Sequence, residues 1–195
     1  LPSGIGMASL AGARRTQSAY PRFQRWAHVS TMAVDAGNNR NFLKQVEQFP
    51  EVVSHQKYTA LDVALLRHGQ PDFHYNFEAL ASADCRFFEQ DRFTPTEGRA
   101  PDPTKGTEVA FNRDAATTYG FHVGQRVDLG TYDDDQVMNA GPDTHLDPVH
   151  RMTATVVGIG AFPEEVVQDE SDRSPLLLLT PAYYRQVARW GTYSW

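Results

Sequence analysis

Cysteine is almost absent from this sequence: its 195 residues include a single one, Cys85. One cysteine excludes a disulfide within the chain, so packing alone must hold the fold together. Basic residues are also in the minority, with 18 Lys and Arg against 24 Asp and Glu and a net charge of −6. An acidic balance argues against nucleic-acid binding, which selects for basic faces.

Several catalytic and nucleotide-binding motifs are missing as well. No G-x-S-x-G turn presents a nucleophilic serine. Gly158-Ile159-Gly160 lacks the third glycine of a dinucleotide-binding loop, and no G-x-x-x-x-G-K-[ST] phosphate loop occurs. We therefore expect a protein that is not an enzyme, that binds no cofactor and that does not hydrolyse ATP itself.

What is present indicates a folded chain. Apolar residues make up 41% and charged residues 22% of the sequence, which is typical of a globular protein. Its length suits one domain, or two small subdomains that share a core. The uncharged stretch 1–13 is shorter than the about 20 apolar residues that a membrane-spanning helix needs.

The segment 93–129 carries the clearest local signals. Pro101 and Pro103 predict a loop over 98–103. A short strand follows over 108–111, and Asn112 is placed to cap a helix that ends before Gly120, where a left-handed residue is favoured. Gly124-Gln125 then predicts a turn into a second strand over 126–132.

The first part of the chain predicts a β-α-β unit. A helix over 14–28 is interrupted at Pro21. A strand over 30–34, a helix over 42–49 and an extended run over 52–66 then follow in order. Alternation of apolar and polar residues predicts a further strand over 72–83.

The last part reads as strands, loops and one helix. We expect a long polar hairpin loop over 133–148 and a strand over 151–162, in which Gly158 and Gly160 indicate a bulge or close backbone approach. An exposed acidic loop is predicted over 163–174, before a buried strand over 176–179. Thr180 and Pro181 then open a helix through Arg189.

The order of these pieces resembles the extracytoplasmic domain of FtsX-like, MacB-type ABC transporter permeases. In that family a G-R-x-P loop precedes an E-V strand, an A-x-x-x-G helix end and a V-G-x-x-V-x-L strand. The pattern returns downstream over 156–159 and 177–181. The positions of the main motif that match are Gly98, Arg99, Pro101, Glu108, Val109, Ala116, Gly120, Val123, Gly124, Val127 and Leu129.

This resemblance implies an α+β fold, with a porter-like β-α-β half beside a mostly β subdomain. It places the remnant of a transmembrane helix or a tail at 1–13, the porter-like part at 14–90 and the mostly β subdomain at 91–181. A helix over 182–195 would lead back to the porter-like part, truncated before that half is complete.

The resemblance also implies function. Such a domain lies outside the cell membrane and transmits ATP-driven motion of the membrane helices to substrate export or to an outside protein partner. Its partners are its own transmembrane helices, a separate ATP-binding subunit or domain, and a second permease half in a dimer.

A second hypothesis is a secreted metal-dependent hydrolase. Asp143, His145, Asp147 and His150 offer four potential zinc ligands within eight residues. Their spacing matches no helical arrangement, and Pro142 and Pro148 predict a loop, so a solvated loop explains them equally. A third hypothesis is a small-ligand-binding β-barrel module, in which the strands over 124–129 and 156–160 wall an apolar pocket.

A few further residues have two interpretations each. Arg99 either ties its loop to Glu97, Glu108 or a carbonyl, or contacts a partner protomer. The aromatic residues near the end of the sequence form either an interface or part of the core: Trp190, Tyr193 and Trp195.

Overall fold

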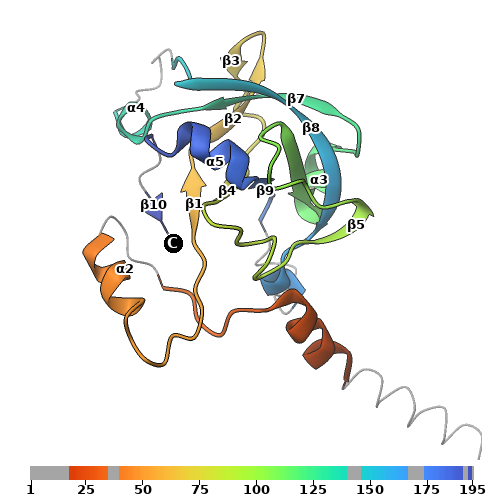
Figure 1. Cartoon of the computed structure of the whole chain (residues 1–195). Helices are drawn as coiled ribbons and strands as arrows, with labels where there is room; N and C mark the ends of the chain where they lie inside the picture. Colours follow the sequence, from red (N-terminus) through yellow and green to blue (C-terminus); the bar gives the residue numbers. More distant parts are fainter. Residues whose placement is uncertain (1–17, 35–39, 140–145, 167–173, 191–192, 195) are drawn as a thin grey trace, which may run out of the picture.

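A strongly curled mixed β-sheet with helices packed on it forms the body of the protein, which confirms the predicted α+β class (Figure 1). The computed structural model describes residues 18–34, 40–139, 146–166, 174–190 and 193–194. Its strands are β1 (Tyr58–Leu61), β2 (Val63–Arg67), β3 (Gln70–Pro71), β4 (Glu78–Ser82), β5 (Thr94–Gly98), β6 (Glu108–Asn112), β7 (Arg126–Thr131), β8 (His150–Ala161), β9 (Leu176–Leu179) and β10 (Tyr193–Ser194).

The strands join in the order β10-β1-β4-β9-β6-β8-β7-β2-β3, and β5 pairs with β8 away from this path. Two pairs are parallel, β4 with β9 and β6 with β8; the others are antiparallel. The long strand β8 pairs with β7 through its first half and with β6 and β5 through its second. Strands from before and after residue 90 thus contribute to one continuous sheet.

The central strands β4, β6 and β9 are buried on both faces of the sheet. Alternate residues point to opposite sides of a strand, and here each side has its own apolar cluster. Val109 and Phe111 lie in the larger cluster, whereas Ala110 lies in the smaller one with Phe87 and Phe162. Because both faces are buried, β6 and β9 have apolar residues at successive positions and do not alternate between apolar and polar ones.

Helix α3 (Arg113–Tyr119) begins and ends at its predicted capping residues, and α5 (Pro181–Val187) begins at its predicted cap. The end predicted for α5 is wrong: the helix stops at Val187, before Arg189, and residues 193–194 form β10 instead of continuing it. The side chain of Asn112 accepts a hydrogen bond from the Ala115 amide, and Gly120 takes a left-handed conformation at φ 73°. Thr180 caps α5 in the same way through the Tyr183 amide. Both helices pack against the larger cluster, through Ala115 and Tyr183.

Four local predictions are wrong in part. Residues 30–34 form no strand, so the predicted β-α-β unit lacks its first strand. The helical segment 18–27 continues through Pro21 without a break. Residues 72–77 stay outside β4. The 133–148 loop contains a short helix, α4 (Asp134–Met138), because the Asp133 side chain and Gln136 form a capping box.

The acidic loop predicted after β8 begins with a buried turn. A 3₁₀ helix, η1 (Pro163–Val166), places Glu165 in the interior, 7% exposed. Its carboxylate accepts hydrogen bonds from the Asn112 side chain and from the Phe162 amide. These partners offset the cost of burying a charge.

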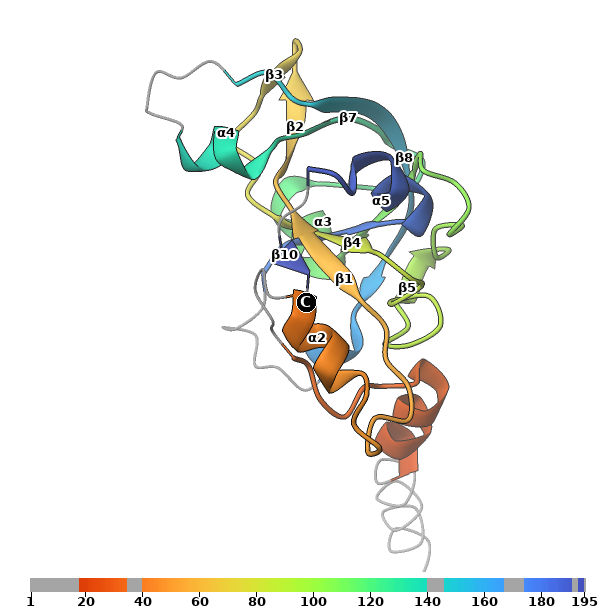
Figure 2. The ribbon, with the colours of Figure 1, turned by 60° about the vertical axis from the view of Figure 1, so that its left-hand side comes forward.

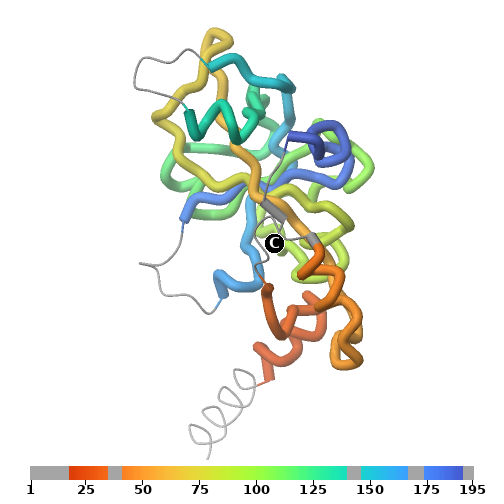
Figure 3. The backbone as a smooth tube through the Cα atoms, turned by 90° about the vertical axis from the view of Figure 1, so that its left-hand side faces the viewer, coloured from red at the N-terminus to blue at the C-terminus, as the bar shows by residue number. Residues whose placement is uncertain are grey.

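The two ends of the molecule differ in construction. The β2–β3 hairpin lies at one end, and the helical segment 18–27 and α2 (Arg40–Val46) lie at the other (Figures 2 and 3). The predicted helix over 42–49 corresponds to α2, which begins two residues earlier and ends at Val46.

Candidate functional site

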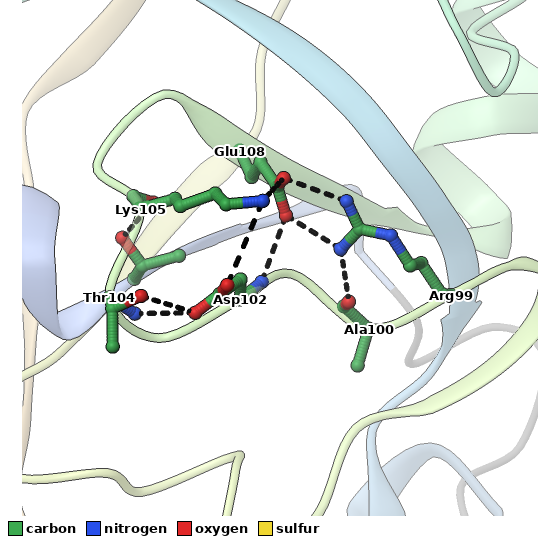
Figure 4. A network of polar contacts seen from close by, with 7 residues as sticks. Arg99, Ala100, Asp102, Thr104, Lys105 and Glu108 are labelled. Atoms are coloured by element: carbon green, nitrogen blue, oxygen red, sulfur yellow. Dashed lines mark hydrogen bonds and ion pairs between the residues drawn. The ribbon is translucent and has the colours of Figure 1, made fainter.

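The loop that carries the G-R-x-P motif is clamped to the sheet through the carboxylate of Glu108. We call residues 98–107, which run from the last residue of β5 to the start of β6, the GR loop. Two guanidinium nitrogens of Arg99 donate to the two carboxylate oxygens of Glu108 at 2.6 and 2.7 Å, and one of them also donates to the Ala100 carbonyl at 3.0 Å (Figure 4). Such bidentate pairs combine strength with a fixed orientation.

Two further residues of the GR loop donate to the same carboxylate, and a third residue, Thr104, bonds to one of them. The Asp102 amide donates to Glu108 at 3.0 Å, and Lys105 Nζ donates to it at 3.1 Å. Thr104 donates to the Asp102 carboxylate through both its amide and its hydroxyl. Glu108 therefore receives four hydrogen bonds, which is close to the full acceptor capacity of a carboxylate.

These contacts shift the titration of the acidic residues. The hydrogen bond from Arg99 is the largest factor that lowers the pKa of Glu108, to about 2, against the opposing effect of burial. Hydrogen bonds from Thr104 lower the pKa of Asp102. The same pairing with Glu108 raises the pKa of Arg99. Each of these pKa shifts favours the charged form of its residue at neutral pH.

The backbone of the GR loop also approaches β8 closely. The register of β6 against β8 shifts between Val109 and Ala110, so Val157 is an extra residue in β8. Its carbonyl accepts from the Arg99 amide at 2.9 Å. A Cβ on Gly158 would lie 2.1 Å from the Arg99 carbonyl oxygen, and one on Gly98 would lie 2.3 Å from the Val157 oxygen. The close backbone approach predicted at Gly158 is confirmed.

The far side of the GR loop is attached to the start of α5. The Ala182 amide donates to the Pro103 carbonyl at 3.1 Å, and the Thr180 hydroxyl donates to the Lys105 carbonyl at 2.9 Å. The GR loop is thus bonded to β6, β8 and α5 together. The polar side chains of Arg99, Asp102, Thr104 and Lys105 all take part in this set of contacts.

The sequence anticipated part of this site. The Arg99–Glu108 contact confirms one of the interpretations given to Arg99. The contributions of Asp102, Thr104 and Lys105 were missed, although an Asp two residues before a Thr is a known turn signal. The side chain of Arg99 is 53% exposed and that of Lys105 is 54% exposed, so both cations also face solvent.

Of the proposed zinc ligands, His150 is the first residue of β8 and Asp147 precedes that strand. Asp143 and His145 fall outside the described residues. Asp147 pairs with Arg151 at 3.2 Å, and its side chain is 72% exposed. Burial lowers the pKa of His150, whose ring packs edge-on against Tyr183 at 5.6 Å. Within the described ranges, no group of three His, Cys, Asp or Glu residues is arranged to hold a metal ion.

The strands of the barrel hypothesis pack against the core. Val127, Leu129 and Val156 are buried members of the larger apolar cluster. They share that cluster with Phe111 and Phe121, whose rings stack 3.9 Å apart. These strands therefore contribute side chains to the apolar core.

The remaining candidates have structural surroundings. Trp190 packs, half-buried, against the larger cluster, whereas the side chain of Tyr193 and the whole of Trp195 lie outside the described residues. Cys85 is half-buried, and burial raises the pKa of its thiol. A raised thiol pKa disfavours the nucleophilic thiolate.

No protein-family model and no curated protein sequence matches this chain. Across the described part of the chain, none of the helices is both long and apolar enough to span a bilayer.

Proposed function

We propose that this chain is the extracytoplasmic domain of an FtsX-like, MacB-type ABC transporter permease. In this proposal ATP-driven closure of cytoplasmic subunits moves the transmembrane helices, and the domain carries that motion to a substrate or to an outside protein. A porter-like part over 14–90 and a mostly β part over 91–181 act together. The domain performs no chemistry of its own.

The observation that carries the proposal is the clamp between Arg99 and Glu108. These residues belong to the G-R-x-P and E-V motifs on which the resemblance depends. They are bonded to each other, and Gly98 lies directly against β8. A domain that transmits motion must resist bending, and a bidentate pair at a junction of β6, β8 and α5 supplies that resistance.

The helical segment 18–27 offers further support. The rings of Tyr20 and Phe23 stack with centroids 6.5 Å apart, and the ring of Trp26 lies tilted against Phe23 at 6.3 Å. Trp26 remains 49% exposed, and Arg22 and Arg25 lie between these rings in sequence. Exposed aromatic and basic residues are typical of segments at a membrane–water interface.

Site-directed labelling of the full-length gene product tests the location. In a background in which Cys85 is replaced by Ser, Phe73→Cys places a thiol on a residue that is 77% exposed. We expect a membrane-impermeant maleimide to label this thiol in intact cells or spheroplasts, and the protein to be recovered from the membrane fraction. Affinity purification should also bring down an ATP-hydrolysing subunit.

A cytoplasmic protein with an engineered surface cysteine provides the control, because it reacts only after lysis. Labelling of the Phe73→Cys thiol only after lysis, or recovery of the full-length protein in the soluble fraction, contradicts the proposal.

A further inference from the structure

A groove of about 610 Å³ lies at the end of the molecule away from the β2–β3 hairpin. Its lining comes from segment 28–34, segment 51–57, α2 and the loop 86–90. The GR loop contributes nothing to this groove. It is therefore separate from the site described above.

Apolar side chains line much of the groove. They come from both segments and from α2: Val29, Met32, Leu43, Val46, Val52 and Val53. Met32 is 67% exposed and Val53 is 94% exposed. Exposed apolar residues that gather around a hollow mark an interaction site more often than isolated ones do.

Two backbone stretches of the groove lining have hydrogen-bonding groups that no described backbone group pairs with. Residues 31–34 and 53–56 belong to no helix or strand. Among the described residues, no backbone hydrogen bond involves the amides or carbonyls of either stretch. Unpaired donors and acceptors of this kind can take up a further strand, as a sheet edge does. An acyl chain could not satisfy these groups, whereas another polypeptide backbone could.

The charges of the groove favour a basic occupant. Its lining includes Glu47, Glu51 and Glu89 against Lys57 and Arg86. Lys57 pairs with Glu47, and Arg86 pairs at 3.2 Å with Asp91, which lies behind the lining. Two carboxylates, those of Glu51 and Glu89, thus have no cationic partner in the described part of the chain.

The wall formed by 86–90 is held in place before any ligand arrives. The Arg86 guanidinium lies 4.6 Å from the centre of the Tyr58 ring. Asp91 accepts from the Ser30 amide at 2.7 Å, and a ring nitrogen of His28 lies 2.8 Å from the Glu89 carbonyl oxygen. These contacts fix the distance between loop 86–90 and segment 28–34. A preformed groove lowers the entropic cost of binding.

We infer that this groove binds an extended polypeptide segment in which apolar and basic residues alternate. The main chain of that segment would bond to residues 31–34 or 53–56, as in strand addition to a sheet edge. Its apolar side chains would enter the groove, and its basic side chains would face Glu51 and Glu89. The inference does not depend on the transporter proposal.

Fluorescence anisotropy with the 195-residue chain and labelled ten-residue peptides tests this inference. A peptide of alternating Val and Lys should bind with micromolar affinity. Replacing every Lys by Glu should weaken binding at least tenfold, because the peptide carboxylates would face Glu51 and Glu89. N-methylation of alternate backbone nitrogens should weaken it by a similar factor, because it removes donors and leaves the net charge unchanged.

Two variants localise the binding. Ala33 lines the groove and is exposed, so Ala33→Trp should fill part of the groove and weaken binding at least tenfold. Ala19→Trp, on the exposed side of segment 18–27, is the matched control and should bind as the original chain does. Glu51→Lys should weaken binding of the Lys peptide and strengthen binding of the Glu peptide.

Hydrogen exchange adds a structural readout, since the amides of 31–34 or 53–56 should become protected when the peptide binds. Three results overturn the inference: equal affinity for the N-methylated peptide, equal effects of Ala33→Trp and Ala19→Trp, or no peptide binding at millimolar concentration. Binding to anionic phospholipid vesicles in place of the peptide also overturns it. The labelling experiment on the full-length protein can fail or succeed without changing any of these outcomes.

Discussion

The guanidinium of Arg99 meets both carboxylate oxygens of Glu108 across nine residues of sequence, at 2.6 and 2.7 Å. Glu108 is buried, 8% exposed, at the first position of β6. The pair therefore joins the end of β5 to the centre of the sheet. It is also the contact on which the proposed rigidity of the domain depends.

Glu108→Gln should destabilise the fold by about 2 kcal/mol, because the cations that face this residue lose their charged acceptor. Urea denaturation monitored by tryptophan fluorescence measures the change. Arg126→Gln, at an exposed position on β7, is the control and should stay within about 0.5 kcal/mol of the original chain. Equal stabilities of the two variants would show that the clamp contributes nothing.

The same carboxylate predicts how stability depends on pH. Its pKa is about 2 in the folded protein, below the ordinary value of 4.5. The stabilisation is therefore complete above about pH 4.5 and is lost as the pH falls toward 2. Denaturation midpoints between pH 5 and 2.5 should fall more steeply for the original chain than for Glu108→Gln. Parallel curves would contradict the assignment.

Gly158→Ala should destabilise the protein more than Gly124→Ala. A Cβ at position 158 would lie 2.1 Å from the Arg99 carbonyl oxygen, so the GR loop would have to move. At Gly124 no atom lies within 4 Å, and the cost is limited to the left-handed backbone at φ +89°, about 1 kcal/mol. Thermal unfolding of both variants gives the comparison, and the reverse order would refute the close approach.

Asp134→Asn should stabilise the protein at neutral pH. Burial, followed by the neighbouring Asp62, raises the pKa of Asp134 to about 6. The stabilisation that the protonated Asp134 contributes is thus fully present below its ordinary pKa of 3.8, and it is lost as the pH rises through about 6. The amide cannot ionise, so we expect a melting temperature a few degrees higher at pH 7.5 and a smaller gain at pH 4.5.

Asp135→Asn serves as the control for this prediction, since Asp135 lies exposed in the same first turn of α4. A gain of the same size in both variants would assign the effect to the overall charge of the helix rather than to the Asp62–Asp134 contact.

Removing metal ions distinguishes the transporter proposal from the hydrolase hypothesis. If the loop of Asp143, His145, Asp147 and His150 has no structural metal, melting curves in zinc, calcium and EDTA should coincide within about 1 °C. A bound ion at saturating concentration would instead raise stability by several kcal/mol. A melting temperature that falls by many degrees in EDTA would support the hydrolase hypothesis instead.

Elements with strong local signals were predicted closely. Asn112 and Gly120 cap the two ends of α3, and Thr180 caps the start of α5. Such capping interactions involve only a few neighbouring residues, so the sequence shows them directly. The buried run of β9 and the glycines of β8 were equally readable, because each pattern has few structural solutions.

Predictions that depend on distant partners were weaker. Strand β5 contains Pro95 and is mostly exposed, so nothing in its composition indicates a strand; pairing with β8 creates it. Residues 30–34 have suitable composition but find no sheet neighbour, and they line the groove instead. The partners of Glu108 beyond Arg99 also depend on how the GR loop closes, which spacing alone does not show.

Strand β8 is bonded on its flanks to β5, β6 and β7, and its pairing with β6 is parallel. A tension applied along this strand would load those bonds in shear, so that they share the load and do not peel apart one after another. Under such a pull the sheet should give way in a single event at high force, and until then it would behave as a stiff element.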